Sequence, residues 1–125
     1  MTALNPSMTE PPPVELCCIE GVAGVLYQEN GRVIIDEMPL SPPQNAALAT
    51  CTRKMCDGYR RARRGVRQVV LGFPCGTLLI HSHDDAQLVL LLLDEIAIDA
   101  ASSAASTFVK ARTQRHLRLP LPPAA

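Results

Sequence analysis

Aromatic side chains are scarce in this 125-residue chain: they make up 3% of its residues, and tryptophan is absent. Proteins that bind single-stranded nucleic acid stack bases on aromatic side chains, so this scarcity disfavours that class. The 12 basic and 12 acidic residues give a formal net charge of +0, which offers no overall attraction to nucleic acid or to an anionic membrane. Any partner must therefore be recognised by a local surface.

Long apolar runs and paired cysteine motifs are also missing. The longest apolar run, Leu88 to Leu93, is far shorter than the roughly 20 residues of a membrane helix, so it predicts a buried strand and no membrane insertion. The N-terminus is polar and lacks a secretory apolar segment. The cysteines are odd in number and include no C-x-x-C pair: Cys17, Cys18, Cys51, Cys56 and Cys75. This usage favours free thiols in a reducing compartment, and we expect the cytoplasm.

Motifs for catalysis or for phosphate binding are not found either. The sequence contains no G-x-x-x-x-G-K-[ST] loop and no G-x-G-x-x-G after a strand, so we do not expect a GTPase. Cys51 is assigned to the apolar stripe of a helix and hence to the core. Cys75 in a turn is the thiol expected to be most exposed, with Cys56 near the flank of the helix as the alternative. No acid, base and nucleophile converge, which predicts neither an enzyme nor a cofactor. A small enzyme on a profilin-like or sensor-like sheet is the less supported alternative.

One histidine-rich stretch resembles a metal cluster at first sight. His81 and His83 are two residues apart and would share one side of a strand, with Asp84 and Asp85 directly after them. A zinc site needs four ligands, or three and a water, and no cysteine pair lies nearby at a suitable spacing. Two consecutive aspartates are typical of a hairpin turn. We therefore predict a turn here and no metal.

The chain does contain turn and helix-start signals that are typical of one folded domain, and this domain lies between two proline-rich ends. Residues 1–13 and 118–125 are predicted to be disordered tails, and residues 14–117 the domain. Asn30-Gly31 between apolar runs is a strong signal for a tight β-hairpin, which pairs residues 22–28 with residues 32–36. Only a short lead-in is expected before this hairpin.

A basic amphipathic helix is predicted next. Ser41 followed by Pro42 and Pro43 is a typical helix start, and Gly65 is expected to end the helix near Arg64. On a helical wheel one side collects mainly apolar residues, namely Leu48, Cys51, Thr52, Met55, Tyr59 and Ala62. The other side carries Arg53, Asp57, Arg60, Arg61 and Arg64.

The second half of the domain changes from helical to β periodicity and back. Three strands are predicted at residues 66–73, 77–82 and 86–93, followed by a helix over residues 96–112. The resulting order is β-β-α-β-β-β-α. It predicts a single-domain α+β fold with a five-stranded antiparallel sheet and helices covering at least one face.

This order resembles the roadblock/dynein light chain family over about residues 15–112. The resemblance rests on IEGVAGVLYQENGRVII, the helix from Ala46, and GTLLIHSHDDAQLVLLLLD. Its most specific part is Gly21-Val22-x-Gly24-Val25 with Gly31 in the following turn. One departure is that family members begin with a well-formed helix, which here is short or missing.

The resemblance implies a roadblock/profilin-like fold without an active site, which dimerises by extension of the sheet. The third strands of two subunits would pair edge to edge, here residues 66–73, and the helices 46–64 would lie side by side as a platform. The implied homodimer or heterodimer interface contains Leu48, Cys51, Met55, Val66, Val69 and Leu71. A monomer in which Arg67 and Gln68 protect an exposed edge is the alternative.

A cluster of positive charge marks the candidate partner surface. Residues 53–67 hold seven basic residues against Asp57 alone, a local excess of +6. The partner-binding residues we single out are Arg53, Arg60, Arg61, Arg64 and Arg67. They suit an acidic protein surface, although a solvated helix face is the common explanation for such a run.

The function that the resemblance implies is a non-catalytic dimeric regulator or scaffold of a small Ras-like GTPase, with stimulation of GTP hydrolysis left open. The alternative is a nucleotide-independent structural adaptor subunit of a larger complex, such as a motor-associated light chain.

Overall fold

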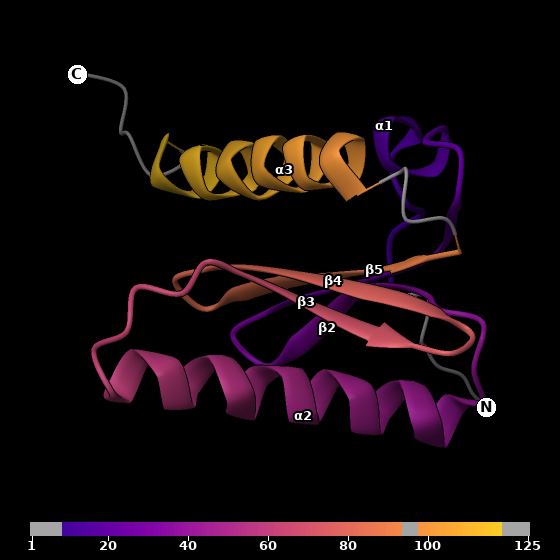
Figure 1. Cartoon of the computed structure of the whole chain (residues 1–125). Helices are drawn as coiled ribbons and strands as arrows, with labels where there is room; N and C mark the ends of the chain where they lie inside the picture. Colours follow the sequence, from indigo (N-terminus) through magenta and orange to yellow (C-terminus); the bar gives the residue numbers. More distant parts are fainter. Residues whose placement is uncertain (1–8, 94–97, 119–125) are drawn as a thin grey trace, which may run out of the picture.

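The fold is a five-stranded antiparallel sheet between two helical layers (Figure 1). The computed structural model describes residues 9–93 and 98–118. In chain order the elements are α1 (Val14–Cys17), β1 (Val22–Glu29), β2 (Arg32–Glu37), α2 (Pro42–Arg61), β3 (Gln68–Phe73), β4 (Gly76–His83), β5 (Ala86–Leu92) and α3 (Ile98–Arg118). The predicted α+β class and element order are confirmed, with the short lead-in forming α1.

The sheet order is β2-β1-β5-β4-β3, so β2 and β3 form its two edges. Helix α2 covers one face, while α3 covers the other with α1 beside its start (Figure 1). The core between sheet and α3 includes Tyr27, Leu88 and Val109, and the core between sheet and α2 includes Leu26 and Val89. Adjacent strand residues thus supply opposite cores, as the two-residue period of a strand requires.

The opening hairpin follows from the turn chemistry of its sequence. Asn30 and Gly31 have φ angles of 52° and 79°, the positive values that a tight two-residue hairpin turn needs. Gly24 has a different role, because a Cβ atom at this position would lie 2.6 Å from Cδ of Pro39 and 2.8 Å from Sδ of Met38. A glycine therefore lets the chain that leaves β2 cross closely over β1.

Helix α2 starts as predicted and ends earlier than predicted. Ser41 and Gln44 form a capping box, in which each side chain accepts a hydrogen bond from the other residue's backbone N–H. At the other end, Arg63 adopts a φ of 57°, and Arg64 N–H bonds the carbonyl of Tyr59 at 2.9 Å. Arg63 thus takes the left-handed position that glycine usually fills in a Schellman cap. The predicted end at Arg64 and Gly65 was wrong for this reason.

The side of α2 that faces the sheet is also rotated from the predicted one. The buried residues are Asn45, Ala49, Thr52 and Cys56, with Leu48 and Met55 partly buried. Cys51 is exposed, so its assignment to the core was wrong. These buried residues lie at positions i, i+4, i+7 and i+11 counted from Asn45, and Cys51 lies outside this series. Burial of the polar Asn45 is tolerated because its side-chain amide donates hydrogen bonds to Asp36 and to the carbonyl of Met38.

Other boundaries shift by short distances. Strand β3 begins at Gln68 rather than at Val66. Strand β4 is one residue longer than predicted at each end, and β5 is one residue shorter at its C-terminal end. Helix α3 continues to Arg118 because no glycine or proline interrupts residues 113–118. Its predicted start at Ile96 falls outside the described residues.

The proline-rich N-terminal end is partly described. Residues 9–13, which we call the strap, lie against β2 and α3, and Glu10 N–H donates to the carbonyl of Ile34 at 2.6 Å. The remaining residues of the two predicted tails, 1–8 and 119–125, lie outside the described residues.

Candidate functional site

The β3 edge is the first candidate interaction surface. Its apolar side chains are exposed to solvent: Val70 is 44% exposed, Leu71 is 37% exposed and Phe73 is 51% exposed. Val69 is half-buried against the α2 side of the sheet, and Val66 just before the strand is 37% exposed. An edge strand offers unpaired backbone groups to another strand, and here apolar side chains accompany them.

The predicted dimer-interface residues fall into two groups. Val66, Val69 and Leu71 lie on or beside the β3 edge. Leu48, Cys51 and Met55 lie on α2, where Cys51 is exposed and the other two are half-buried. Exposure of Cys51 excludes it from the core of one chain and leaves it open to a contact with another.

The predicted basic surface lies at the C-terminal end of α2 and in the segment after it. Arg61, Arg64 and Arg67 are all exposed. Arg60 is already engaged, because it bridges Asp57 at 3.0 Å and Asp85 at 2.8 Å, and the hydrogen bond with Asp85 raises its pKa. The bridge to Asp85 joins the end of α2 to the β4–β5 turn, and both bridges reduce the free positive charge.

Arg53 belongs to the same helix but lies apart from this end. A Cβ atom on Gly31 would come within 2.6 Å of one of its terminal nitrogens, so Arg53 reaches over the β1–β2 turn. Between α2 and the turns is a hollow of about 260 Å³, lined by Arg53, Arg60 and Gln87 among others. Gln87 is 1% exposed, and its Oε1 has no hydrogen-bond partner. Arg53 and Arg60 thus border the hollow with basic side chains.

The histidine stretch forms the end of β4 and a turn, as predicted. Asp84 has a positive φ of 51° in that turn, and His83 Nε2 lies 3.5 Å from its carboxylate. His81 is only 8% exposed, and its Nδ1 has no partner. Burial first, and then His83, Lys110 and Arg67, lower the pKa of His81. Among the side chains that the structure describes, those of residues 9–93 and 98–113, no cluster of three or more His, Cys, Asp or Glu is arranged to hold a metal ion.

The free thiols are distributed differently from the prediction. Cys75 is exposed, which confirms the sequence interpretation, and Cys17 and Cys18 are exposed as well. Cys56 is buried, and burial raises the pKa of its thiol. A raised pKa disfavours the thiolate, so Cys56 is a poor nucleophile.

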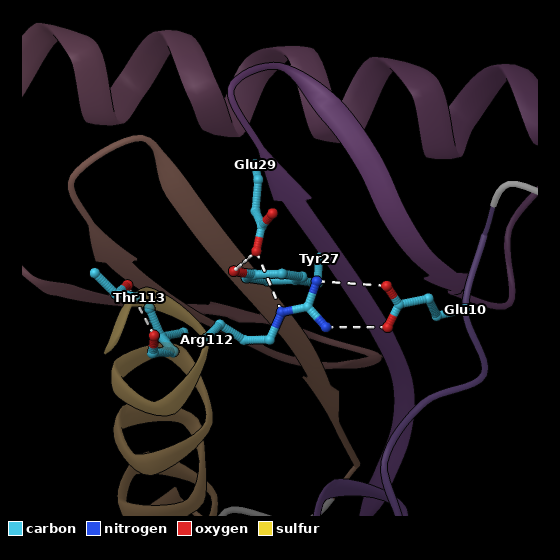
Figure 2. Close-up of polar contacts among 6 residues, drawn as sticks. Glu10, Tyr27, Glu29, Arg112 and Thr113 are labelled. Atoms are coloured by element: carbon cyan, nitrogen blue, oxygen red, sulfur yellow. Dashed lines mark hydrogen bonds and ion pairs between the residues drawn. The ribbon is translucent and has the colours of Figure 1, made fainter. Parts of the chain in front are cut away.

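The most connected polar cluster was missed by sequence reasoning. Arg112 on α3 donates from Nε to Glu29 at 3.2 Å and from both terminal nitrogens to Glu10, at 3.0 and 3.4 Å (Figure 2). Its guanidinium lies 5.5 Å from the ring centre of Tyr27 and 6.0 Å from that of Phe108. These residues come from the strap, β1 and α3.

Opposing effects set the protonation of this cluster. Burial acts to lower the pKa of Arg112, but the carboxylates of Glu10 and Glu29 outweigh it and raise the pKa. Burial also raises the pKa of Tyr27, whose hydroxyl donates to Glu29 Oε2 at 2.6 Å. The Arg112 guanidinium therefore keeps its positive charge near neutral pH. The sequence signal was weak: Tyr27 and Glu29 share one side of β1, and nothing local points to Arg112.

No helix in the described ranges is long and apolar enough to cross a membrane. No protein-family model matches the chain, and no curated protein matches it. Solved structures do match. A Roadblock/LC7 domain from Streptomyces avermitilis aligns with a TM-score of 0.56 at 15% identity, over 79% of this chain and 92% of that one. A second structure of a Roadblock/LC7 domain from that organism gives 0.54 at 16% identity, over 78% and 89%.

The gliding protein MglB from Thermus thermophilus aligns with a TM-score of 0.52 at 16% identity, over 83% of this chain and 99% of that one. Likeness at this sequence identity concerns the backbone arrangement alone, and it extends over most of this chain and of each neighbour. The resemblance predicted from the sequence is thus confirmed at the level of the fold, and the chain has the Roadblock/LC7 fold.

Proposed function

We propose that this chain is a non-catalytic, dimeric regulator or scaffold of a small Ras-like GTPase. The observation that carries the proposal is an exposed apolar β3 edge together with a basic end of α2, on a Roadblock/LC7 fold. The edge serves dimerisation and the basic end serves the partner. The link to GTPases comes from the family resemblance, and the charge of the surface supports it.

Dimerisation follows from the cost of an open apolar edge. Pairing two copies of β3 would satisfy the outward backbone groups and cover Val70, Leu71 and Phe73, which are otherwise in water. The same arrangement would bring the two α2 helices together, where Cys51 is exposed. A continuous sheet with one shared helical platform is the assembly that we expect.

Arg61, Arg64 and Arg67 would then contact an acidic surface of the GTPase. Charge complementarity of this kind speeds encounter and fixes orientation more than it adds affinity. The platform favours one nucleotide state of the GTPase only if it binds that state more tightly than the other. A scaffold without such a preference would hold the GTPase equally in both states.

The test is capture of partners by the tagged full chain from native lysate, in parallel with a non-hydrolysable GTP analogue and with GDP. We expect mass spectrometry to identify a Ras-like GTPase enriched with the GTP analogue. A nucleotide-independent set of large proteins would support the adaptor alternative instead.

The purified GTPase would then be titrated with the triple variant Arg61→Glu, Arg64→Glu, Arg67→Glu. Arg60 is left intact because its charge is already engaged by Asp57 and Asp85. We expect weaker binding with an unchanged dimer mass. Lys110→Glu, on the opposite helical layer, is the control and should bind normally. Equal binding by the triple variant would refute the basic surface as the contact.

A further inference from the structure

The strap lies in a groove between β2 and α3. Its first contact is between main chains, since Glu10 N–H donates to the carbonyl of Ile34 on the outer edge of β2. Its second is between side chains, because the Glu10 carboxylate accepts hydrogen bonds from both terminal nitrogens of Arg112 (Figure 2). A strand-like backbone contact and a forked ion pair thus fix the same residue.

Arg112 is held in position by groups outside the strap. Its Nε donates to Glu29, its guanidinium lies near the rings of Tyr27 and Phe108, and its side chain is 15% exposed. These contacts leave the two terminal nitrogens pointing together at Glu10 (Figure 2). A guanidinium held in this way is preorganised for a carboxylate, and its side chain loses little conformational entropy when it binds one.

Beside this receptor the groove is incompletely filled and is lined by both polar and apolar side chains. A cavity of about 250 Å³ remains between the strap and the domain, bordered by Pro11 and Pro13 on one side and by Ile35, Phe108 and Ala111 on the other. Proline-rich segments adopt an extended helix without internal hydrogen bonds and dock readily on aromatic and aliphatic side chains. The groove therefore has the features of a peptide site.

We propose that this groove binds extended acidic, proline-rich peptides of other proteins, and that the strap occupies it in cis. A carboxylate binds Arg112, the N–H of the same residue pairs with Ile34, and the prolines that follow lie over Ile35 and Phe108. The strap itself, Glu10 followed by three prolines, supplies the pattern. A partner peptide would displace the strap and free the N-terminal end of the chain.

Exchange is feasible because few contacts hold the strap. The Glu10 side chain is 49% exposed, and the only backbone hydrogen bond between residues 9–13 and a strand of the described chain is the one to Ile34. The strap nevertheless competes well, since a tethered segment acts at an effective concentration in the millimolar range. Opening the strap should therefore reveal binding in trans.

The test uses the full chain and a fluorescein-labelled peptide with the sequence of residues 9–15, followed by fluorescence anisotropy. In the strap-opening variant Glu10→Lys the tethered segment is repelled by Arg112. We expect this variant to bind the peptide about tenfold or more tightly than the natural chain does. Glu20→Lys makes the same charge change at an exposed residue of the α1–β1 turn and should behave like the natural chain.

A second peptide, with glutamine in place of the Glu10 equivalent, tests the carboxylate without altering the protein. It should bind the Glu10→Lys chain about tenfold more weakly, because charge-assisted forked hydrogen bonds are replaced by neutral ones. The double variant Glu10→Lys, Arg112→Lys keeps the charge at Arg112 but loses the fork, and should weaken binding similarly. Equal binding of the two peptides, or no binding to Glu10→Lys at millimolar peptide, would overturn the proposal.

Discussion

The two edges of the sheet are treated in opposite ways. On β2, exposed charges at Arg32, Asp36 and Glu37 line the strand, a register shift interrupts its pairing with β1, and the strap contacts its outer side at Ile34. On β3 the exposed large apolar side chains are Val70, Leu71 and Phe73, and pairing with β4 is regular throughout. Charged side chains, a register shift and the strap protect the β2 edge. The β3 edge has none of these features and exposes apolar side chains to pairing with another strand.

The largest effect should come from a charge on the β3 edge. Leu71→Glu would place like charges near one another in a β3–β3 pair, a cost of several kcal/mol, so we expect the dimer dissociation constant to rise about a hundredfold or more. Sedimentation equilibrium measures it. Arg32→Glu adds an acidic group on the β2 edge and should leave the dimer intact. If the natural chain were monomeric at micromolar concentration, the claim that the β3 edge pairs with a second copy would be wrong.

On the β2 side, the next largest effect should follow from loss of Arg112. Arg112→Ala removes the ion pairs of this side chain with Glu29 and Glu10, and we expect the free energy of unfolding to fall by about 2 kcal/mol. Urea denaturation measures the change. Lys110→Ala, at an exposed position of the same helix, should stay within about 0.5 kcal/mol of the natural chain. Similar losses in both variants would show that the cluster does not stabilise this edge.

Acid should weaken the β3 side of the sheet through His81. Its pKa is lowered in the folded state, first by burial, so below the unfolded value of 6.5 the unfolded chain binds a proton that the folded chain does not. Stability is thus complete above pH 6.5 and falls as the pH drops toward the folded pKa, by up to about 1.4 kcal/mol per pH unit. Urea midpoints between pH 7.5 and 5.5 should show this slope in the natural chain. The slope should be reduced in His83→Gln, which lacks one of the charges that lower the pKa of His81, and smallest in His81→Gln.

The smallest effect concerns the segment that leads into β3. Arg63 holds a left-handed conformation that costs a non-glycine residue roughly 1–2 kcal/mol, so Arg63→Gly should raise the free energy of unfolding by about 0.5 kcal/mol after the greater freedom of glycine in the unfolded chain is counted. Thermal denaturation measures it. Gly65→Ala has open space around the new methyl group and should not destabilise the chain. Destabilisation by Gly65→Ala, without stabilisation by Arg63→Gly, would instead identify Gly65 as the residue that ends the helix.

Local chemistry explains which expectations from the sequence were confirmed. Asn30-Gly31 specifies a tight turn by itself, and Ser41 followed by prolines specifies a helix start, because each involves neighbouring residues only. The helix end was misplaced because glycine is merely the usual residue at a left-handed cap, and Arg63 occupies it here. The buried side of α2 was misjudged at Cys51, since an average over a helical wheel does not say which part of a broad stripe meets the sheet.

The candidate site divides in the same way. The basic residues at the end of α2 are close in sequence, so their cluster was visible, but the engagement of Arg60 by Asp85 was not, because that contact joins α2 to a distant turn. The Glu10–Arg112 pair spans 102 positions of the chain and left no local trace. Contacts at such separation depend on how layers pack, which residue types alone do not specify.

By itself the sequence determined the order of strands and helices, the hairpin turn, the helix start and the local excess of positive charge, because short-range conformational preference and apolar periodicity act within a few residues. Only the tertiary structure decided which edge of the sheet is covered and which is open, that Arg112 receives the strap, and that His81 is buried among basic groups. Those features arise where segments far apart in the chain meet, and their energies exist only once the layers are packed together.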